Sequence, residues 1–163
     1  MKRLTLSGDA CTETLALLII MAWADGRLDD KEKEGVRAAS QVFNLTKELR
    51  ERLDQLLEKP MTVDELLFDG LSARDKAFAY VAASWLTNVD DDVDEKEKQL
   101  LDKVGDLFKL SPERRKELQQ IARDLESLRK DGANWTSELV SLFKAIPQRL
   151  EGDGTETFEV AFE

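Results

Sequence analysis

The hydrophobic positions of this chain follow helical spacing, except in two segments that are apolar on almost every side. The segments Leu15–Ala24 and Ala77–Leu86 are the two exceptions. A helix that is apolar all round must be buried, so we expect these two to pack against each other at the centre, with amphipathic helices outside them. One amphipathic face is formed by Leu49, Leu53, Leu56 and Leu57.

The two central segments belong to an internal repeat. When Trp23 is aligned with Trp85, Leu28–Lys33 falls on Val93–Lys98 after three extra residues in the second copy. The alignment continues through the pairs Phe43 and Phe108, Leu45 and Leu110, and Leu53 and Leu118. The sequence therefore predicts a three-helix unit that occurs twice.

These elements predict a single all-α domain over residues 1–150, with pseudo-two-fold symmetry, seven or eight helices and no sheet. We place repeat one at about 9–59, a connector at 60–72, repeat two at about 73–130 and a last helix at about 135–149. Thr46 and Ser111 are expected to cap equivalent helices, because a hydroxyl oxygen accepts from a free N–H of the first turn. We expect Trp23 and Trp85 to be mostly buried and to anchor the core.

The C-terminal tail, residues 151–163, differs from the rest of the chain. It has five acidic residues and no basic one, and its apolar residues Phe158, Val160 and Phe162 alternate with period two. That spacing suits an extended segment, which we expect to dock on an apolar groove of this molecule or of a neighbour. A homodimer formed through the tail is one such arrangement.

Composition narrows the classes of function. The formal net charge of −10 argues against nucleic acid as a partner, since phosphate binding needs clustered basic residues. The chain lacks histidine, the commonest general base, so we expect no enzyme. Its one cysteine, Cys11, fits a reducing cytoplasm, and both apolar segments are too short to span a membrane.

A carboxylate-rich turn follows each central segment. Acidic residues are unfavourable where a helix ends, because the dipole is already negative there and the last carbonyls lack partners. A weakly bound calcium or magnesium ion would relieve that repulsion, and we expect no other cofactor. The candidate ligands are Asp25, Asp29 and Glu32 in the first copy, and Asp90, Asp91, Asp92, Asp94 and Glu97 in the second.

The segment Ala22–Glu32, with its Ala-Asp-Gly at 24–26, resembles the signature of the TerB-like tellurite-resistance family. The resemblance extends over about Leu15–Leu57 and, more weakly, Ala77–Leu128, where Thr87–Val89 replaces Ala-Asp-Gly. It implies an all-helical fold without established enzymatic chemistry, a proposed cation-binding acidic surface, and roles in bacterial stress or membrane-associated complexes. Related domains beside J-domain co-chaperones imply protein contacts.

Three interpretations of the acidic turns therefore stand: capped and solvated turns, a hard-cation site, or a protein-interaction surface. The first functional hypothesis is a non-enzymatic binding protein that resembles TerB, associated with stress or tellurite resistance, whose acidic turns bind a hard cation. The alternative is a protein–protein interaction or adaptor module, co-chaperone-like or immunity-like, without a metal. An enzyme is the remaining alternative.

Overall fold

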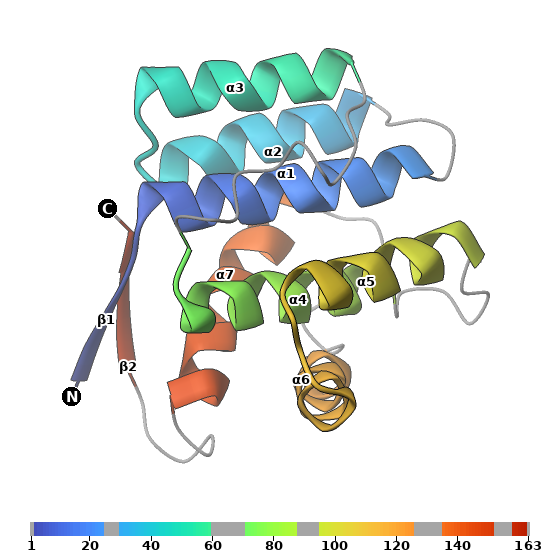
Figure 1. Cartoon of the computed structure of the whole chain (residues 1–163). Helices are drawn as coiled ribbons and strands as arrows, with labels where there is room; N and C mark the ends of the chain where they lie inside the picture. Colours follow the sequence, from blue (N-terminus) through green and yellow to red (C-terminus); the bar gives the residue numbers. More distant parts are fainter. Residues whose placement is uncertain are drawn as a thin grey trace.

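The computed structural model describes residues 2–24, 30–59, 71–87, 95–125, 135–151 and 158–162. Seven helices and two short strands make up most of these residues (Figure 1). They are β1 Lys2–Leu6, α1 Gly8–Ala24, α2 Asp30–Val42, α3 Lys47–Glu58, α4 Ala73–Thr87, α5 Glu95–Leu107, α6 Pro112–Asp124, α7 Trp135–Glu151 and β2 Phe158–Phe162. The prediction of an all-α domain is confirmed.

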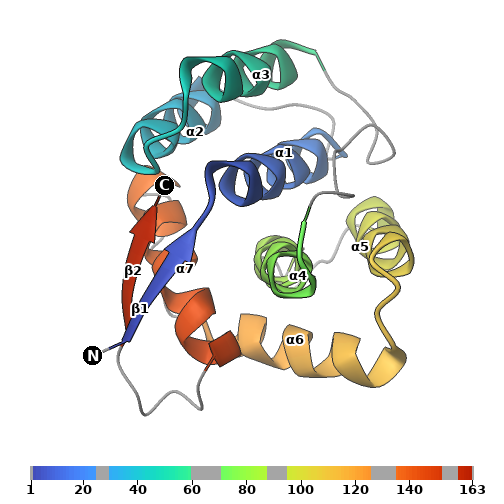
Figure 2. The same cartoon turned by 60° about the vertical axis from the view of Figure 1, so that its left-hand side comes forward.

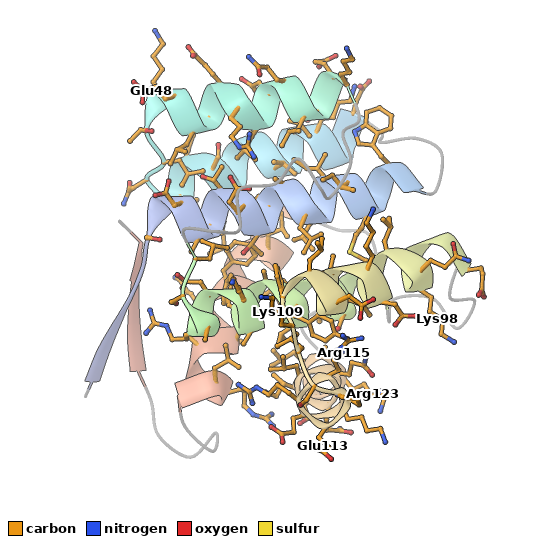
Figure 3. All side chains as sticks on the ribbon, viewed as in Figure 1. Glu48, Lys98, Lys109, Glu113, Arg115 and Arg123 are labelled. Carbon is orange, nitrogen blue, oxygen red and sulfur yellow. The ribbon has the colours of Figure 1, made fainter. Side chains whose placement is uncertain are left out.

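The two apolar helices α1 and α4 lie side by side at the centre, as predicted. Helices α2 and α3 cover one side of the pair, and α5 and α6 cover the other (Figures 1 and 2). Leu17 and Ile19 of α1, like Ala79 and Ala82 of α4, have no exposed surface. The outer faces instead carry exposed charged side chains, including Glu48, Lys98 and Glu113 (Figure 3).

The two three-helix units repeat each other down to single hydrogen bonds. Asn44 and Lys109, which follow α2 and α5, both have a φ of 57°. The next residue in each copy, Leu45 or Leu110, donates its N–H back to the helix just completed. The hydroxyls of Thr46 and Ser111 then accept from the N–H groups of Leu49 and Arg114, as the capping prediction requires.

Both indoles link a central helix to the third helix of its own unit. Trp23 donates Nε1–H to the carbonyl of Leu56 at 3.1 Å, and Trp85 donates to the carbonyl of Leu125 at 3.0 Å. Trp85 is buried as predicted, whereas Trp23 is only partly buried. Each indole nitrogen is thereby satisfied within the protein, which fits a core role.

Helix α7 has no counterpart in the repeat and closes the core between the units. Its Phe143 stacks on Phe43, with ring centroids 4.7 Å apart, and meets Phe78 edge-on at 5.0 Å. The helix continues through Pro147 and ends at Glu151. Because α7 packs on α2 and α4, it joins both units into one core.

The prediction that residues 1–150 contain no sheet is wrong. Strand β1 pairs in parallel with β2, placing Leu4 opposite Val160 and Leu6 opposite Phe162. Residues Phe158–Phe162 of the tail are extended as predicted, but their partner is the N-terminal strand of the same chain. Backbone pairing satisfies the N–H and C=O groups of the two strands along their shared edge, which docking on an apolar groove would leave without partners.

Candidate functional site

The structure does not describe the side chains of the predicted cation ligands. Asp25, Asp29, Asp90, Asp91, Asp92 and Asp94 lie outside the described residues. Glu32 and Glu97 lie in the first turns of α2 and α5, at equivalent positions, but their side chains are outside the description. Among the residues that are described, no acidic, cysteine or histidine side chains gather closely enough to hold a metal. The cation site therefore stays a prediction.

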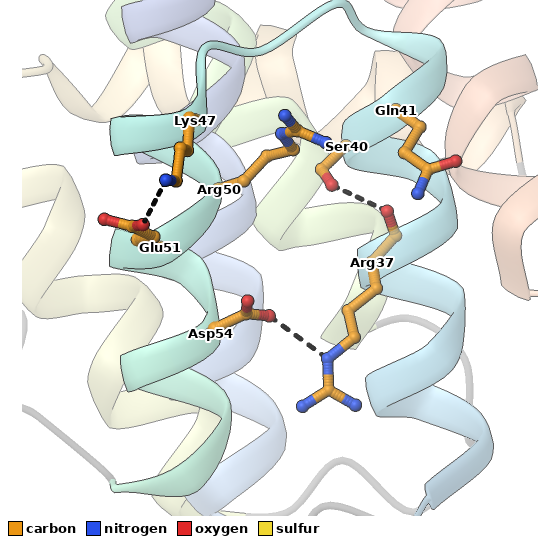
Figure 4. A pocket seen from close by; sticks show the side chains of 7 residues that line it. All are labelled: Arg37, Ser40, Gln41, Lys47, Arg50, Glu51 and Asp54. Carbon is orange, nitrogen blue, oxygen red and sulfur yellow. Dashed lines mark hydrogen bonds and ion pairs between the residues drawn. The ribbon is translucent and has the colours of Figure 1, made fainter.

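A polar cavity of about 360 Å³, here called the notch, opens between α2 and α3 (Figure 4). It lies beside the corner where α2 passes into α3. The N-cap Thr46 and the αL residue Asn44 fix that corner, so both walls of the notch are held by backbone geometry. Its lining consists of Arg37, Ser40, Gln41, Lys47, Arg50, Glu51 and Asp54.

Most charged groups of the notch already have partners. Arg37 Nε donates to Asp54 Oδ1 at 3.1 Å, and Lys47 Nζ lies 3.9 Å from Glu51 Oε1. The side chain of Arg50 points from α3 toward α2 and forms no hydrogen bond or ion pair with any described residue (Figure 4). Three basic and two acidic side chains give the lining a formal charge of +1.

The equivalent corner of the second unit is filled. The alignment that pairs Phe43 with Phe108 also pairs Arg50 with Arg115. Arg115 donates Nε–H to the carbonyl of Leu110 at 3.0 Å and Nη2–H to Asp106 Oδ1 at 2.8 Å. It lies near the turn from α5 to α6 (Figure 3). Both acceptors of the Arg115 guanidinium therefore belong to its own unit.

Glycine makes the filled arrangement possible. A Cβ atom added to Gly105 would lie only 2.8 Å from Cζ and Nε of Arg115. The first unit has Ser40 at the position of Gly105, and its Cβ takes the space that the guanidinium would need. Gln41 stands at the position of Asp106, so the carboxylate is absent as well. These two differences keep the first notch open.

An exposed apolar residue precedes each corner. Val42 and Leu107 are the large hydrophobic residues with the greatest exposure among those described, at 46% and 40%. They occupy the same position in the two units, one residue before Phe43 and Phe108. Val42 ends α2, one residue after Gln41 of the open notch, so the α2–α3 corner exposes an apolar side chain as well as the polar cavity.

Sequence reasoning missed Arg50 because a surface arginine carries no motif. The signal was present in the repeat: alignment of the two copies shows a glycine and an aspartate replaced by Ser40 and Gln41, with the arginine retained. Only the side-chain geometry of Arg115 shows what that retained arginine does when both residues are present.

The single thiol is placed where it does not react. Cys11 lies in α1 with no exposed surface. Burial, with a smaller effect from the charge of Asp75, raises the pKa of the thiol to about 12. The thiolate, which is the nucleophilic form, is therefore scarce at neutral pH.

The fold and the notch define a class: a domain of two three-helix units around a buried helix pair, with an open polar notch on one unit. The chain belongs to the family described as a protein of unknown function (DUF533), whose model matches residues 7–122. That match covers both units and stops before α7. No curated protein and no solved structure matches the chain. None of the described helices has the length and apolar character needed to cross a bilayer.

Proposed function

We propose that this domain is a non-catalytic module that binds a partner polypeptide through the α2–α3 corner. One observation carries the proposal: the notch at the α2–α3 corner is open, whereas its counterpart in the second unit is filled by its own arginine, and the same corner exposes Val42 at the end of α2. Protein interfaces combine an apolar contact with a rim of polar groups, and this corner offers both.

The remaining chemistry supports binding over catalysis. The chain has no histidine, and the Cys11 thiol, with its pKa of about 12, is buried in the central helix. Arg37 of α2 pairs with Asp54 and Glu58 of α3, whereas Lys47 pairs with Glu51 within α3. The pairs of Arg37 join the two walls of the notch, which suits a recognition surface.

Photo-crosslinking tests this proposal. A photoreactive amino acid placed at Val42 should give a discrete adduct with one partner in cells, because the partner covers that side chain. The matched control carries the same group at Leu107, beside the filled corner of the second unit. Adducts of equal yield and identity at both positions, or none at Val42, would count against the proposed surface.

The cation site is a second candidate. Neither α1 nor α4 has a basic residue in its last turn, so the chain places no described positive charge at the helix ends where the acidic turns begin. This favours calcium or magnesium at the turns that contain Asp25 and Asp90. Millimolar calcium should then raise the melting temperature, and Asp90→Asn with Asp92→Asn should abolish the rise.

The relation to the TerB-like family and a role in stress or tellurite resistance rest on the resemblance of Ala22–Glu32. A strain that lacks the gene should then grow poorly on tellurite and recover when the gene is returned. Recovery with the wild type but not with the Asp90→Asn, Asp92→Asn variant would connect that role to the acidic turns. Equal growth of all strains on tellurite would remove it.

A further inference from the structure

We propose that the notch binds the carboxylate of an acidic residue on a partner polypeptide, and that Arg50 holds it. This inference rests on the proposed function and names the chemistry that the surface recognises. Its basis is a comparison of the two equivalent corners. In the second unit Arg115 binds Asp106. The first unit has Arg50 at the position of Arg115, but Gln41 at the position of Asp106.

The second unit shows what an arginine at this position binds. Arg115 uses Nη2 for a carboxylate oxygen at 2.8 Å and Nε for the carbonyl of Leu110 at 3.0 Å. The planar guanidinium presents several N–H donors in one fork, which is why arginine suits carboxylate recognition. Arg50 has the same donors at the wall of a cavity, and no described residue accepts from its side chain.

Because of Ser40, the acid that binds Arg50 must come from another polypeptide. Ser40 stands where Gly105 leaves room for Arg115, and a Cβ atom at that position comes within 2.8 Å of a guanidinium placed as that of Arg115, so Arg50 does not fit its own unit in the conformation of Arg115. The Ser40 hydroxyl itself donates to the carbonyl of Arg37 at 2.6 Å and does not bind Arg50. The guanidinium is therefore left facing the cavity.

Charge and surroundings favour a single carboxylate on a polypeptide. The lining has a formal charge of +1, which one carboxylate neutralises, whereas a phosphate dianion would leave excess negative charge beside Glu51 and Asp54. Val42 ends α2 and is 46% exposed, so an apolar residue elsewhere on the partner segment would find a contact at the same corner. We therefore expect a partner segment that carries Asp or Glu together with an apolar residue.

A random peptide library displayed on phage tests the inference. Selection on the wild-type domain should enrich peptides that carry Asp or Glu at one fixed position together with an apolar residue. A synthetic peptide of the enriched sequence should bind Arg50→Gln about 10- to 100-fold more weakly, the effect of losing a charged hydrogen bond. The same peptide with Asn or Gln in place of its acid should lose a similar factor.

Two variants separate the notch from general surface charge. Ser40→Gly with Gln41→Asp copies the second unit, so it should fold, let Arg50 close onto the new Asp, and lose peptide binding by a similar factor. Arg114→Gln removes an exposed arginine of α6 and should leave peptide affinity unchanged. Circular dichroism and thermal melts confirm that each variant is folded.

The outcomes distinguish the inference from the function on which it rests. Enriched peptides without a fixed acid, or peptides that bind the closed variant as tightly as the wild type, overturn the carboxylate site. A crosslinked adduct at Val42 that survives Arg50→Gln unchanged also overturns it while leaving the binding module intact. Competition by acetate alone at the peptide's own concentration points to a small anion and overturns the polypeptide partner.

Discussion

Arg52 of α3 binds both carboxylate oxygens of Glu13 in α1, with Nε and Nη2 each donating at 3.2 Å. The Glu13 side chain is only 5% exposed, so this ion pair is largely shielded from water. The pair connects a central helix to the outer helix that forms one wall of the notch.

Replacing Arg52 with Ala should lower the free energy of unfolding by about 3 kcal/mol, because it removes the guanidinium from a buried carboxylate. Chemical denaturation measures the change. The control is Arg114→Ala, which breaks an exposed pair with Glu117 and should cost less than about 1 kcal/mol. Equal losses for the two variants would show that the buried pair is worth no more than a surface one.

Cys11 makes the free energy of unfolding depend on pH in the alkaline range. Its pKa rises from the unfolded value of 9.0 to about 12 in the folded protein, so between these values the unfolded chain releases a proton that the folded chain keeps. Stability is therefore intact below pH 9 and falls as the pH rises toward 12. Cys11→Ala should reduce the slope of unfolding free energy against pH in that window, and an unchanged slope contradicts the raised pKa.

The pairing of β1 with β2 should stabilise the fold. Deleting residues 152–163 removes β2, so the backbone groups of β1 lose their partners; we expect a loss of about 1–2 kcal/mol, several hydrogen bonds at modest net value. Urea denaturation measures it, and removing Glu163 alone, which follows β2, should change nothing. Identical stability of the two truncated proteins would mean that the strand pair contributes little.

Local signals explain what the sequence predicted. The apolar segments around Leu17 and Ala79 could be placed at the centre because burial follows directly from composition, and Thr46 and Ser111 act through N–H groups three residues away. The pairing of β1 with β2 joins five-residue segments from opposite ends of the chain, and no local pattern encodes such a partner.

The notch needed a different kind of information. Arg50 and Arg115 look alike in the sequence, and their different roles depend on whether a Cβ atom stands at position 40 or 105. A Cβ atom added at position 105 would lie 2.8 Å from the Arg115 guanidinium, and a hydrophobicity pattern carries no information about such a contact. The acidic turns, which the sequence did single out, lie outside the described residues, so Asp25 and Asp90 remain predicted ligands only.

Gly105→Ala tests this geometry, because the sign of its effect on the free energy of unfolding should depend on Arg115. Glycine-to-alanine substitution inside a helix normally stabilises it by about 1 kcal/mol. In this protein the added Cβ would meet Arg115 at 2.8 Å and displace its guanidinium from Asp106 and from the carbonyl of Leu110. We therefore expect Gly105→Ala to destabilise the wild-type domain by about 1 kcal/mol, the loss of these hydrogen bonds outweighing the helix propensity.

The same substitution should stabilise the domain once the arginine is gone. In an Arg115→Ala background nothing opposes the new Cβ, so Gly105→Ala should recover the usual gain of about 1 kcal/mol. The two substitutions would then be non-additive by about 2 kcal/mol, a coupling that chemical denaturation of the four proteins resolves. Additive effects would mean that Arg115 does not fill its corner as the structure has it, and the contrast with the open notch of Arg50 would lose its physical basis.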